Sequence, residues 1–257
     1  MIRDISLDNY EEQLEQALAN IVENSSDSLK LMLKFFTLLD TPKIEPAQLQ
    51  PDYSIGSRKI NIIKTSQELE DAIKCMNASP FIGFDSEQKP TFKKGEKSHG
   101  ISLIQLATAT NCYIIQNKQI KDISPLIRLL EDGNIIKIGT GLKGDKQELY
   151  SQFKIRLKST IDLEETLKKL SSKDGIGAKR AASMFLNKNL QKSKNMSRSN
   201  WENQELSNGQ IKYASEDATV VYDTMIQILK DYPFIIKTLP KFFQDKFSLN
   251  TTLNHLR

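Results

Sequence analysis

Residues 81–87 read FIGFDSE, and this stretch decides the fold. Its apolar start predicts a buried β-strand, and the strand ends in two carboxylates, Asp85 and Glu87. Alternate side chains of a strand share one face, so these two acids should converge at the strand's end. Neighbouring carboxylates repel each other unless a cation lies between them, and hard divalent ions such as Mg²⁺ or Mn²⁺ prefer oxygen ligands. Taken alone, the pair also fits a strand that simply ends in hydrated acids.

Strand and helix patterns alternate around this segment. A run of β-rich stretches is followed by helix–strand alternation, which predicts an α/β fold with a mixed sheet flanked by helices. Thr65 and Glu68 form a capping-box pattern that opens the first helix after the first strand. The expected strands are residues 59–64, 81–87, 101–108, 111–116, 134–139 and 159–163, and the expected helices are 68–76, 124–132, 145–153, 163–170, 178–186 and a long one beginning near 206.

The N-terminal region is expected to be helical and to end in a linker. Leu14, Leu18 and Ile21 keep a helical spacing, and a second amphipathic run covers 29–39. Prolines and small polar residues then mark 41–57 as a linker. The expected units are a small helical appendage with its linker (1–56), the main domain (57–232) and a C-terminal tail (233–257).

The residue inventory leaves carboxylates to carry any demanding chemistry. His99 and His255 are the only histidines, and neither Cys75 nor Cys112 lies in a metal-binding spacing. This argues against a zinc cluster and against a Ser-His-Asp triad. The formal net charge of +4 is a weak bias toward polyanions.

The sequence lacks the usual signals for a membrane or for secretion. No stretch approaches the roughly 18 apolar residues of a membrane span, and the acidic start does not match a secretory signal. We therefore expect an intracellular protein, cytoplasmic or, in a eukaryote, nuclear, without a membrane partner.

A tyrosine and an acid lie one turn apart in the long final helix, in the sequence Tyr213-Ala-Ser-Glu-Asp217. Both side chains should project from one face, beside an apolar stripe that includes Ile211 and Ala218. A phenol one turn above a carboxylate can hold a water that the carboxylate's metal ion has made more acidic. The alternative is a packed tyrosine beside an exposed acid.

A glycine-rich turn, GTGLKG at 139–144, precedes Asp145. It matches the GxGxxG pattern of dinucleotide-binding turns, and Asp162 follows where a ribose-binding acid would lie. However, Asp145 would bring negative charge to the helix N-terminus that should hold the pyrophosphate, and the three consecutive strands 81–87, 101–108 and 111–116 already precede the strand that leads into this turn. We therefore favour a tight strand-to-helix turn that delivers Asp145 toward Asp85.

Taken in order, these motifs resemble those of the DEDD superfamily of 3′→5′ exonucleases, in particular its tyrosine-bearing branch. The family's DxE motif is matched by Asp85 and Glu87, and its glycine turn with an aspartate by Asp145. Its YxxxD motif is matched by Tyr213 and Asp217.

The layout is most similar to the Werner-type exonuclease domains and to the ribonuclease D group, over roughly residues 59–229. The sister branch of the superfamily has a histidine five residues before the last aspartate, where this chain has Lys212. One departure is Gln88, which stands where the family often has tryptophan.

The resemblance implies a ribonuclease H-like fold and a metal-dependent 3′→5′ exonuclease. In that mechanism Asp85, Glu87, Asp145 and Asp217 hold two Mg²⁺ or Mn²⁺ ions, and Tyr213 orients the attacking water. The implied substrate is DNA or RNA with a free 3′ end, and the implied products are nucleoside 5′-monophosphates. Two alternatives remain: a catalytically weak nucleic-acid-binding scaffold on the same fold, and a dinucleotide-binding enzyme that uses GTGLKG. No motif indicates a protein partner.

Two basic clusters are candidates for phosphate contacts. One lies between the strands at 81–87 and 101–108, and the other precedes Trp201, which is expected to be packed rather than stacked on a base. Phosphate contacts would make binding salt-dependent, whereas solvated loops are the alternative for both clusters. Their members are Lys93, Lys94 and Lys97 in the first, and Lys192, Lys194 and Arg198 in the second.

Overall fold

The computed structural model describes residues 26–40, 50–77, 79–93, 95–171 and 175–247. At its centre is a six-stranded sheet in the order β1-β4-β3-β2-β5-β6. β3 is antiparallel to both of its neighbours, whereas the other pairs are parallel. The predicted mixed sheet is therefore confirmed. Its strands are β1 (Lys59–Ile63), β2 (Ile82–Gln88), β3 (Ile101–Ala107), β4 (Asn111–Ile115), β5 (Lys137–Gly139) and β6 (Thr160–Asp162).

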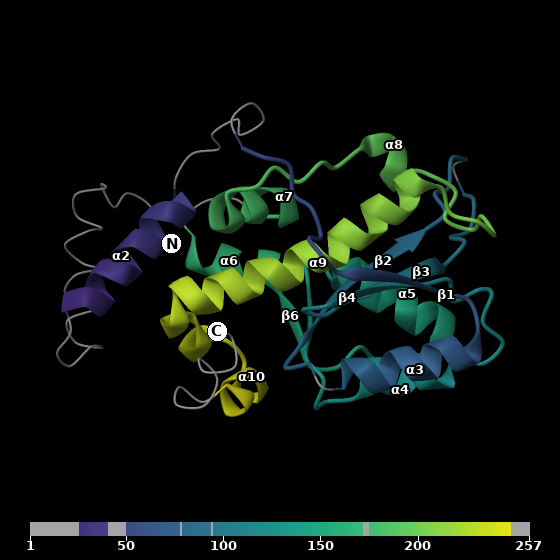
Figure 1. Cartoon of the computed structure of the whole chain (residues 1–257), viewed down its shortest axis with the longest axis horizontal. Coiled ribbons are helices and arrows are strands. Elements are labelled where there is room, and N and C mark those ends of the chain that lie inside the picture. The colour runs from purple at the N-terminus through teal and green to yellow at the C-terminus, as the bar shows by residue number, and fades with distance from the viewer. Residues whose placement is uncertain (1–25, 41–49, 78, 94, 172–174, 248–257) are drawn as a thin grey trace.

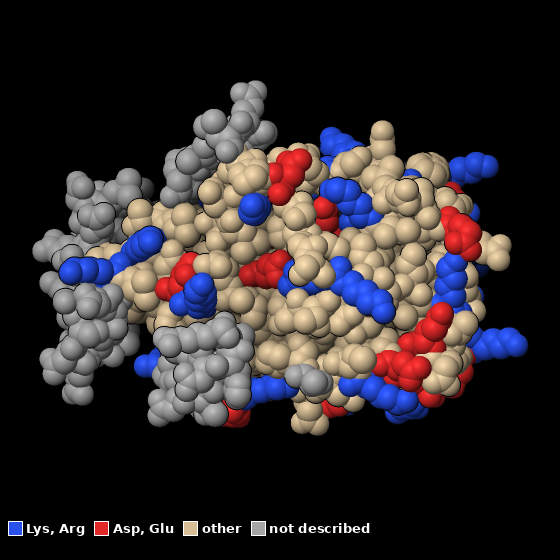
Figure 2. All heavy atoms as spheres, in the orientation of Figure 1, with Lys and Arg blue, Asp and Glu red and all other residues tan. Residues whose placement is uncertain are grey.

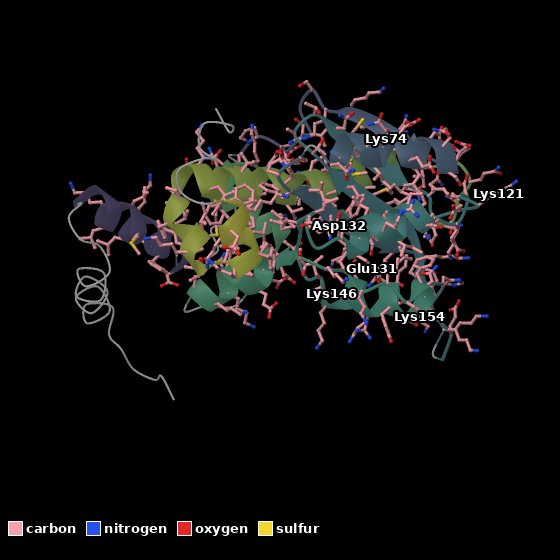
Figure 3. All side chains as sticks on the ribbon, turned by 90° about the horizontal axis from the view of Figure 1, so that it is seen from below. Lys74, Lys121, Glu131, Asp132, Lys146 and Lys154 are labelled. Atoms are coloured by element: carbon pink, nitrogen blue, oxygen red, sulfur yellow. The ribbon has the colours of Figure 1, made fainter. Side chains whose placement is uncertain are left out.

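Helices cover both faces of this sheet, as Figure 1 shows. The long helix α9 crosses one face, and α3, α4 and α5 pack on the other. Figure 3 views this second layer from below and labels Lys74, Lys146 and Lys154, which are exposed. The helices are α3 (Ser66–Met76), α4 (Ser124–Glu131), α5 (Lys143–Phe153), α6 (Leu163–Leu170) and α9 (Asn208–Asp231). The capping box at Thr65 and Glu68 is present as predicted.

The described parts of both terminal regions pack on the α9 side of the core. In α2 (Ser26–Asp40), Phe35 is fully buried and its ring centroid lies 4.8 Å from that of Tyr232. Beyond α9, the chain forms the 3₁₀ helix η3 (Pro233–Thr238) and α10 (Lys241–Lys246). Phe243 of α10 packs near Phe81, with 6.4 Å between ring centroids. The expected helix around Leu14 lies outside the described residues.

The region between α6 and α9 differs in detail from the prediction. The helix expected at 178–186 is α7 (Ala178–Ala181) followed by a π-helical turn, η2 (Ala182–Leu186). The basic stretch after it contains a short helix, α8 (Lys194–Ser197), because the Ser193 side chain accepts a hydrogen bond from the Met196 amide and caps it. Periodicity predicts apolar faces, and it carries little information about a four-residue helix in a polar stretch.

The chain just before α8 is tied to the strand-like residues 51–53. The Asn189 amide donates to the Pro51 carbonyl over 3.0 Å, and the Tyr53 amide donates to the Asn189 carbonyl over 2.9 Å. Leu190 is fully buried. Residues 187–193, called the support segment below, are therefore held firmly beside α9.

No helix within the described residues is long and apolar enough to cross a membrane.

Candidate metal centre

β2 passes directly beneath α9. A Cβ added to Gly83 would lie 2.1 Å from the carbonyl oxygen of Ala218, so only glycine allows this approach. Asp85 and Glu87 follow on the same face of β2, because alternate residues of a strand share a face. Asp217 directly precedes Ala218 in α9. The crossing therefore brings the helix acid to the two strand acids.

Asp85, Glu87 and Asp217 form a compact carboxylate group. One oxygen from each lies within 4.8 Å of the others, which is close enough for one cation to touch all three. Asp217 is 4% exposed, whereas Asp85 and Glu87 are half-buried. The structure thus brings together three of the four acids that the sequence predicts as metal ligands.

The pKa values of all three carboxyl groups are raised above their ordinary values. Burial and the nearby Asp217 raise the pKa of Asp85 well above its ordinary value. Burial, Asp85 and Asp217 raise the pKa of Glu87 to about 9. Burial also raises the pKa of Asp217, although the Lys192 ammonium opposes it. Without a divalent cation, this group of acids resists full ionisation.

The residues fit a divalent metal ion. Oδ2 of Asp217 is buried and has no hydrogen-bond partner among the described residues, and a buried carboxylate oxygen without a partner is costly. An ion such as Mg²⁺ or Mn²⁺ would satisfy it with the oxygen ligation that these metals prefer. Asp85, Glu87 and Asp217 are the residues that would hold the ion.

Asp145 lies in the first turn of α5 and is connected to this group through β2. The hydroxyl of Ser86 donates a hydrogen bond to Oδ1 of Asp145. Burial raises the pKa of Asp145, and this hydrogen bond partly offsets the rise. Asp145 is not one of the three acids that converge within 4.8 Å. Its role as a ligand, directly or through water, stays a prediction.

Tyr213 is buried over the same group, only 8% exposed. Its ring lies 5.9 Å from that of Trp201, which is itself 1% exposed and therefore packed, as expected. Burial and the charge of Asp217 raise the pKa of Tyr213, so its phenol stays protonated. The sequence predicts that Tyr213 and Asp217 share a face of α9, and it does not predict that Trp201 and Lys192 cover that face.

The side chain of Lys192 extends from the support segment to the acidic group. Its Nζ lies 2.6 Å from Oδ1 of Asp217 and 5.3 Å from the centroid of the Tyr213 ring. Burial lowers the pKa of Lys192, but Asp217 and Asp85 outweigh that effect and raise it. The sequence marks Lys192 only as a member of a basic cluster, since no spacing rule connects it to an acid 25 positions later.

The remaining basic candidates lie at the surface. Lys93, Lys97, Lys194 and Arg198 are exposed, and Lys94 lies outside the described residues. On the face shown in Figure 2, basic and acidic side chains of the described residues are interspersed over the surface. Among the described members of the two clusters, Lys192 is therefore the one that the structure brings to the acids.

The glycine turn at 139–144 has a structural role. Gly141 has a φ of +68°, and a Cβ on Gly139 would lie 2.8 Å from the carbonyl oxygen of Phe84. The carboxylate of Asp162 accepts hydrogen bonds from the amides of Gly141 (3.1 Å) and Leu142 (2.8 Å). These amides would have to bind a pyrophosphate in a dinucleotide site. Since an acid of the same chain already occupies them, the dinucleotide interpretation is not favoured.

The fold and this centre together define a ribonuclease H-like α/β protein with an acidic site suited to divalent metal ions. The sequence pattern of the 3′-5′ exonuclease family matches residues 60–232. The chain belongs to that family, and the resemblance seen in its motifs is confirmed.

Relatives and solved structures agree with this assignment. The chain is 26% identical over 181 residues to a 3′-5′ exonuclease of Arabidopsis thaliana, which covers 70% of this chain and 61% of that protein. It is 30% identical over 152 residues to the bifunctional 3′-5′ exonuclease/ATP-dependent helicase WRN of Mus musculus, covering 58% of this chain and 11% of that protein. It therefore spans less than two thirds of either relative. In fold it resembles Escherichia coli RNase D, with a TM-score of 0.62 and 21% identity over 73% of this chain and 48% of that one.

Proposed function

We propose that this protein is a metal-dependent 3′→5′ exonuclease that releases nucleoside 5′-monophosphates from the 3′ end of DNA or RNA. The observation that carries the proposal is the convergence of Asp85, Glu87 and Asp217 within 4.8 Å at the crossing of β2 and α9. Membership of the 3′-5′ exonuclease family and the fold shared with RNase D support it.

The residues divide the work between ion binding and substrate positioning. Asp85, Glu87 and Asp217 would hold the divalent cations, and Asp145 would complete the cage from the side of Ser86. Two Mg²⁺ or Mn²⁺ ions in such a centre would supply a more acidic water and stabilise charge on the departing 3′-oxygen. Tyr213, kept protonated, holds the attacking water for in-line attack on the terminal phosphodiester.

Lys192 takes part in the same proposed mechanism. Its ammonium lies on Asp217 and balances the carboxylates when no divalent ion is present. With divalent ions held by the acids, the Lys192 ammonium would be free to contact a non-bridging oxygen of the terminal phosphate. A charge-assisted contact of that kind would stabilise the negative charge that develops on the phosphate in the transition state.

The test is digestion of oligonucleotides labelled at the 5′ end, as DNA and as RNA, with Mg²⁺, Mn²⁺ or EDTA. The expected result is a ladder that shortens from the 3′ end, requires divalent ions and is absent in EDTA. A circular single strand offers no 3′ end and should stay intact. Cutting inside the circle by the pure protein, or no metal-dependent digestion of any linear strand, would contradict the proposal.

A further inference from the structure

Gln105 in β3 is a fully buried amide without partners. Its exposed fraction is 0%, and neither Oε1 nor Nε2 has a hydrogen-bond partner among the described residues. An amide can donate two hydrogen bonds and accept two, and leaving all of them unmade in the interior is costly. Leucine or methionine at this buried position would give a more stable fold than an unpaired amide. The presence of glutamine therefore suggests a role other than stability.

The strand register places this amide beside the acids. Gln105 is the direct antiparallel partner of Asp85, and directly paired residues point to the same face of a sheet. Its neighbours on that face are Leu103 and Ala107, which pair with Glu87 and Gly83. Gln105 therefore lies in the row of β3 that faces the metal-binding row of β2.

The packing of those two neighbours locates Gln105 under α9. Leu103 clusters with Tyr213 and Ala214, whereas Ala107 belongs to the cluster of Ala218. Gln105, between them, lies beneath the helical turn 214–218. This is the turn that carries Asp217, whose Oδ2 is also buried without a hydrogen-bond partner among the described residues.

We propose that Gln105 is a positioning residue of the metal centre. With a divalent ion bound, its two N–H groups would hold the carboxylates of Asp85 and Asp217 in the orientation that binds the ion. Groups that orient metal ligands in this way act through the ligand, and their loss typically lowers metal affinity about 10–100-fold. The inference deepens the proposed function and depends on it.

The test uses Gln105→Met, which keeps the side chain long and unbranched and removes the amide. The dissociation constant for Mn²⁺ is measured by calorimetry, and the thermal unfolding midpoint is measured in EDTA. We expect the affinity for Mn²⁺ to fall about 10-fold or more, while the midpoint in EDTA rises because a buried unpaired amide is gone. Exonuclease activity should fall in parallel with metal occupancy.

Gln116 supplies the matched control. It is also buried, at 3% exposure, and its Oε1 likewise has no partner among the described residues, but its Nε2 donates to the Asn203 carbonyl over 2.9 Å. Gln116→Met should therefore lower the midpoint in EDTA and leave Mn²⁺ affinity unchanged, which is the opposite signature.

Each outcome of these measurements either supports or overturns the proposed role of Gln105. Unchanged Mn²⁺ affinity in Gln105→Met overturns the proposal, and so does a lower midpoint in EDTA like that of the control. If Gln105→Met does not fold, Gln105→Leu is measured in the same way, and failure of both to fold shows a structural role and overturns the proposal. If the unaltered protein neither binds Mn²⁺ nor degrades nucleic acid, the proposed function itself fails. If the unaltered protein binds Mn²⁺ and degrades nucleic acid, and Gln105→Met binds Mn²⁺ equally well, only the proposed role of Gln105 is refuted.

Discussion

The ammonium nitrogen of Lys192 lies 2.6 Å from Oδ1 of Asp217, one of the three converging carboxylates. A cation therefore already touches the carboxylate that the proposed mechanism assigns to a divalent ion. The support segment holds this lysine in place, since Leu190 is buried and Asn189 is hydrogen-bonded to Pro51 and Tyr53. The lysine side chain remains 35% exposed, so it has room to turn toward a substrate.

Lys192→Met should change metal binding and stability in opposite directions. The metal-free protein should lose about 1–3 kcal/mol of unfolding free energy, because Asp217 becomes a buried carboxylate without its counter-ion. Affinity for Mn²⁺ should increase, because no ammonium competes for Asp217, while kcat/KM falls through loss of the phosphate contact. Chemical denaturation in EDTA, calorimetry and the nuclease assay measure these three quantities. Lys194→Met is the matched control on the neighbouring exposed lysine, and equal effects of both variants would contradict the assignment.

The pH dependence of stability should reveal the crowded acids. Burial, Asp85 and Asp217 raise the pKa of Glu87 to about 9, against an ordinary value of 4.5. The folded state then binds more protons than the unfolded state between these values, so stability decreases as pH rises through that window. We expect the unfolding midpoint in EDTA to fall from pH 5 to pH 8.5, and Mn²⁺ to diminish that fall. Glu87→Gln should flatten the EDTA profile, and an unaltered profile in that variant would show that other groups cause the slope.

Asp85→Ala should abolish exonuclease activity while the fold survives. The change removes a ligand from the centre of the acidic group, and loss of a group that stabilises developing charge typically costs at least about 10²–10³-fold in rate. The metal-free variant should unfold at the same temperature as the original protein or higher, because one of the repelling carboxylates is gone. Circular dichroism confirms the fold and calorimetry follows Mn²⁺. Retention of two bound ions together with nuclease activity would refute the catalytic interpretation.

Tyr213→Phe should separate water positioning from metal binding. The variant keeps the ring against Trp201 and loses one hydroxyl. A group that orients water or transfers a proton typically contributes about 10²–10⁴-fold, so weak activity should remain measurable while Mn²⁺ affinity is nearly unchanged. Single-turnover rates at saturating Mn²⁺ are the measurement. Full activity would show that the phenol has no part in the reaction.

The sequence predicts the strands and the carboxylate motifs because both leave local signals. FIGFDSE combines an apolar run with alternation, and the capping box at Thr65 and Glu68 is read from spacing alone. The DxE and YxxxD acids, Asp85, Glu87 and Asp217, do converge.

The features that the sequence does not predict depend on contacts between distant segments. Helical periodicity indicates which side of α9 meets the sheet, but not that Trp201 and Lys192 cover another side and bury Tyr213. Gln105 reads as one polar residue inside a β-rich run, and only the register with Asp85 shows its position. Short elements such as α8 are set by a single cap, Ser193, within a polar stretch.

Gly83→Ala tests whether the crossing of β2 and α9 builds the centre. The new Cβ would lie 2.1 Å from the carbonyl oxygen of Ala218, so α9 must move away from β2. Overpacking of this kind typically costs about 1–3 kcal/mol, and the displacement carries Asp217 away from Asp85. The unfolding midpoint should therefore fall, and Mn²⁺ affinity should fall with it.

Gly144→Ala is the control for this substitution. Gly144 lies in α5, and an added Cβ meets nothing within 4 Å. Alanine at such a helical position should raise stability by about 0.5–1 kcal/mol, because the unfolded chain loses conformational freedom. Metal affinity should not change, although Asp145 is the next residue. If Gly83→Ala binds Mn²⁺ as tightly as the unaltered protein, the close approach of β2 and α9 is not what positions the acids, and the geometric basis of the proposed centre is wrong.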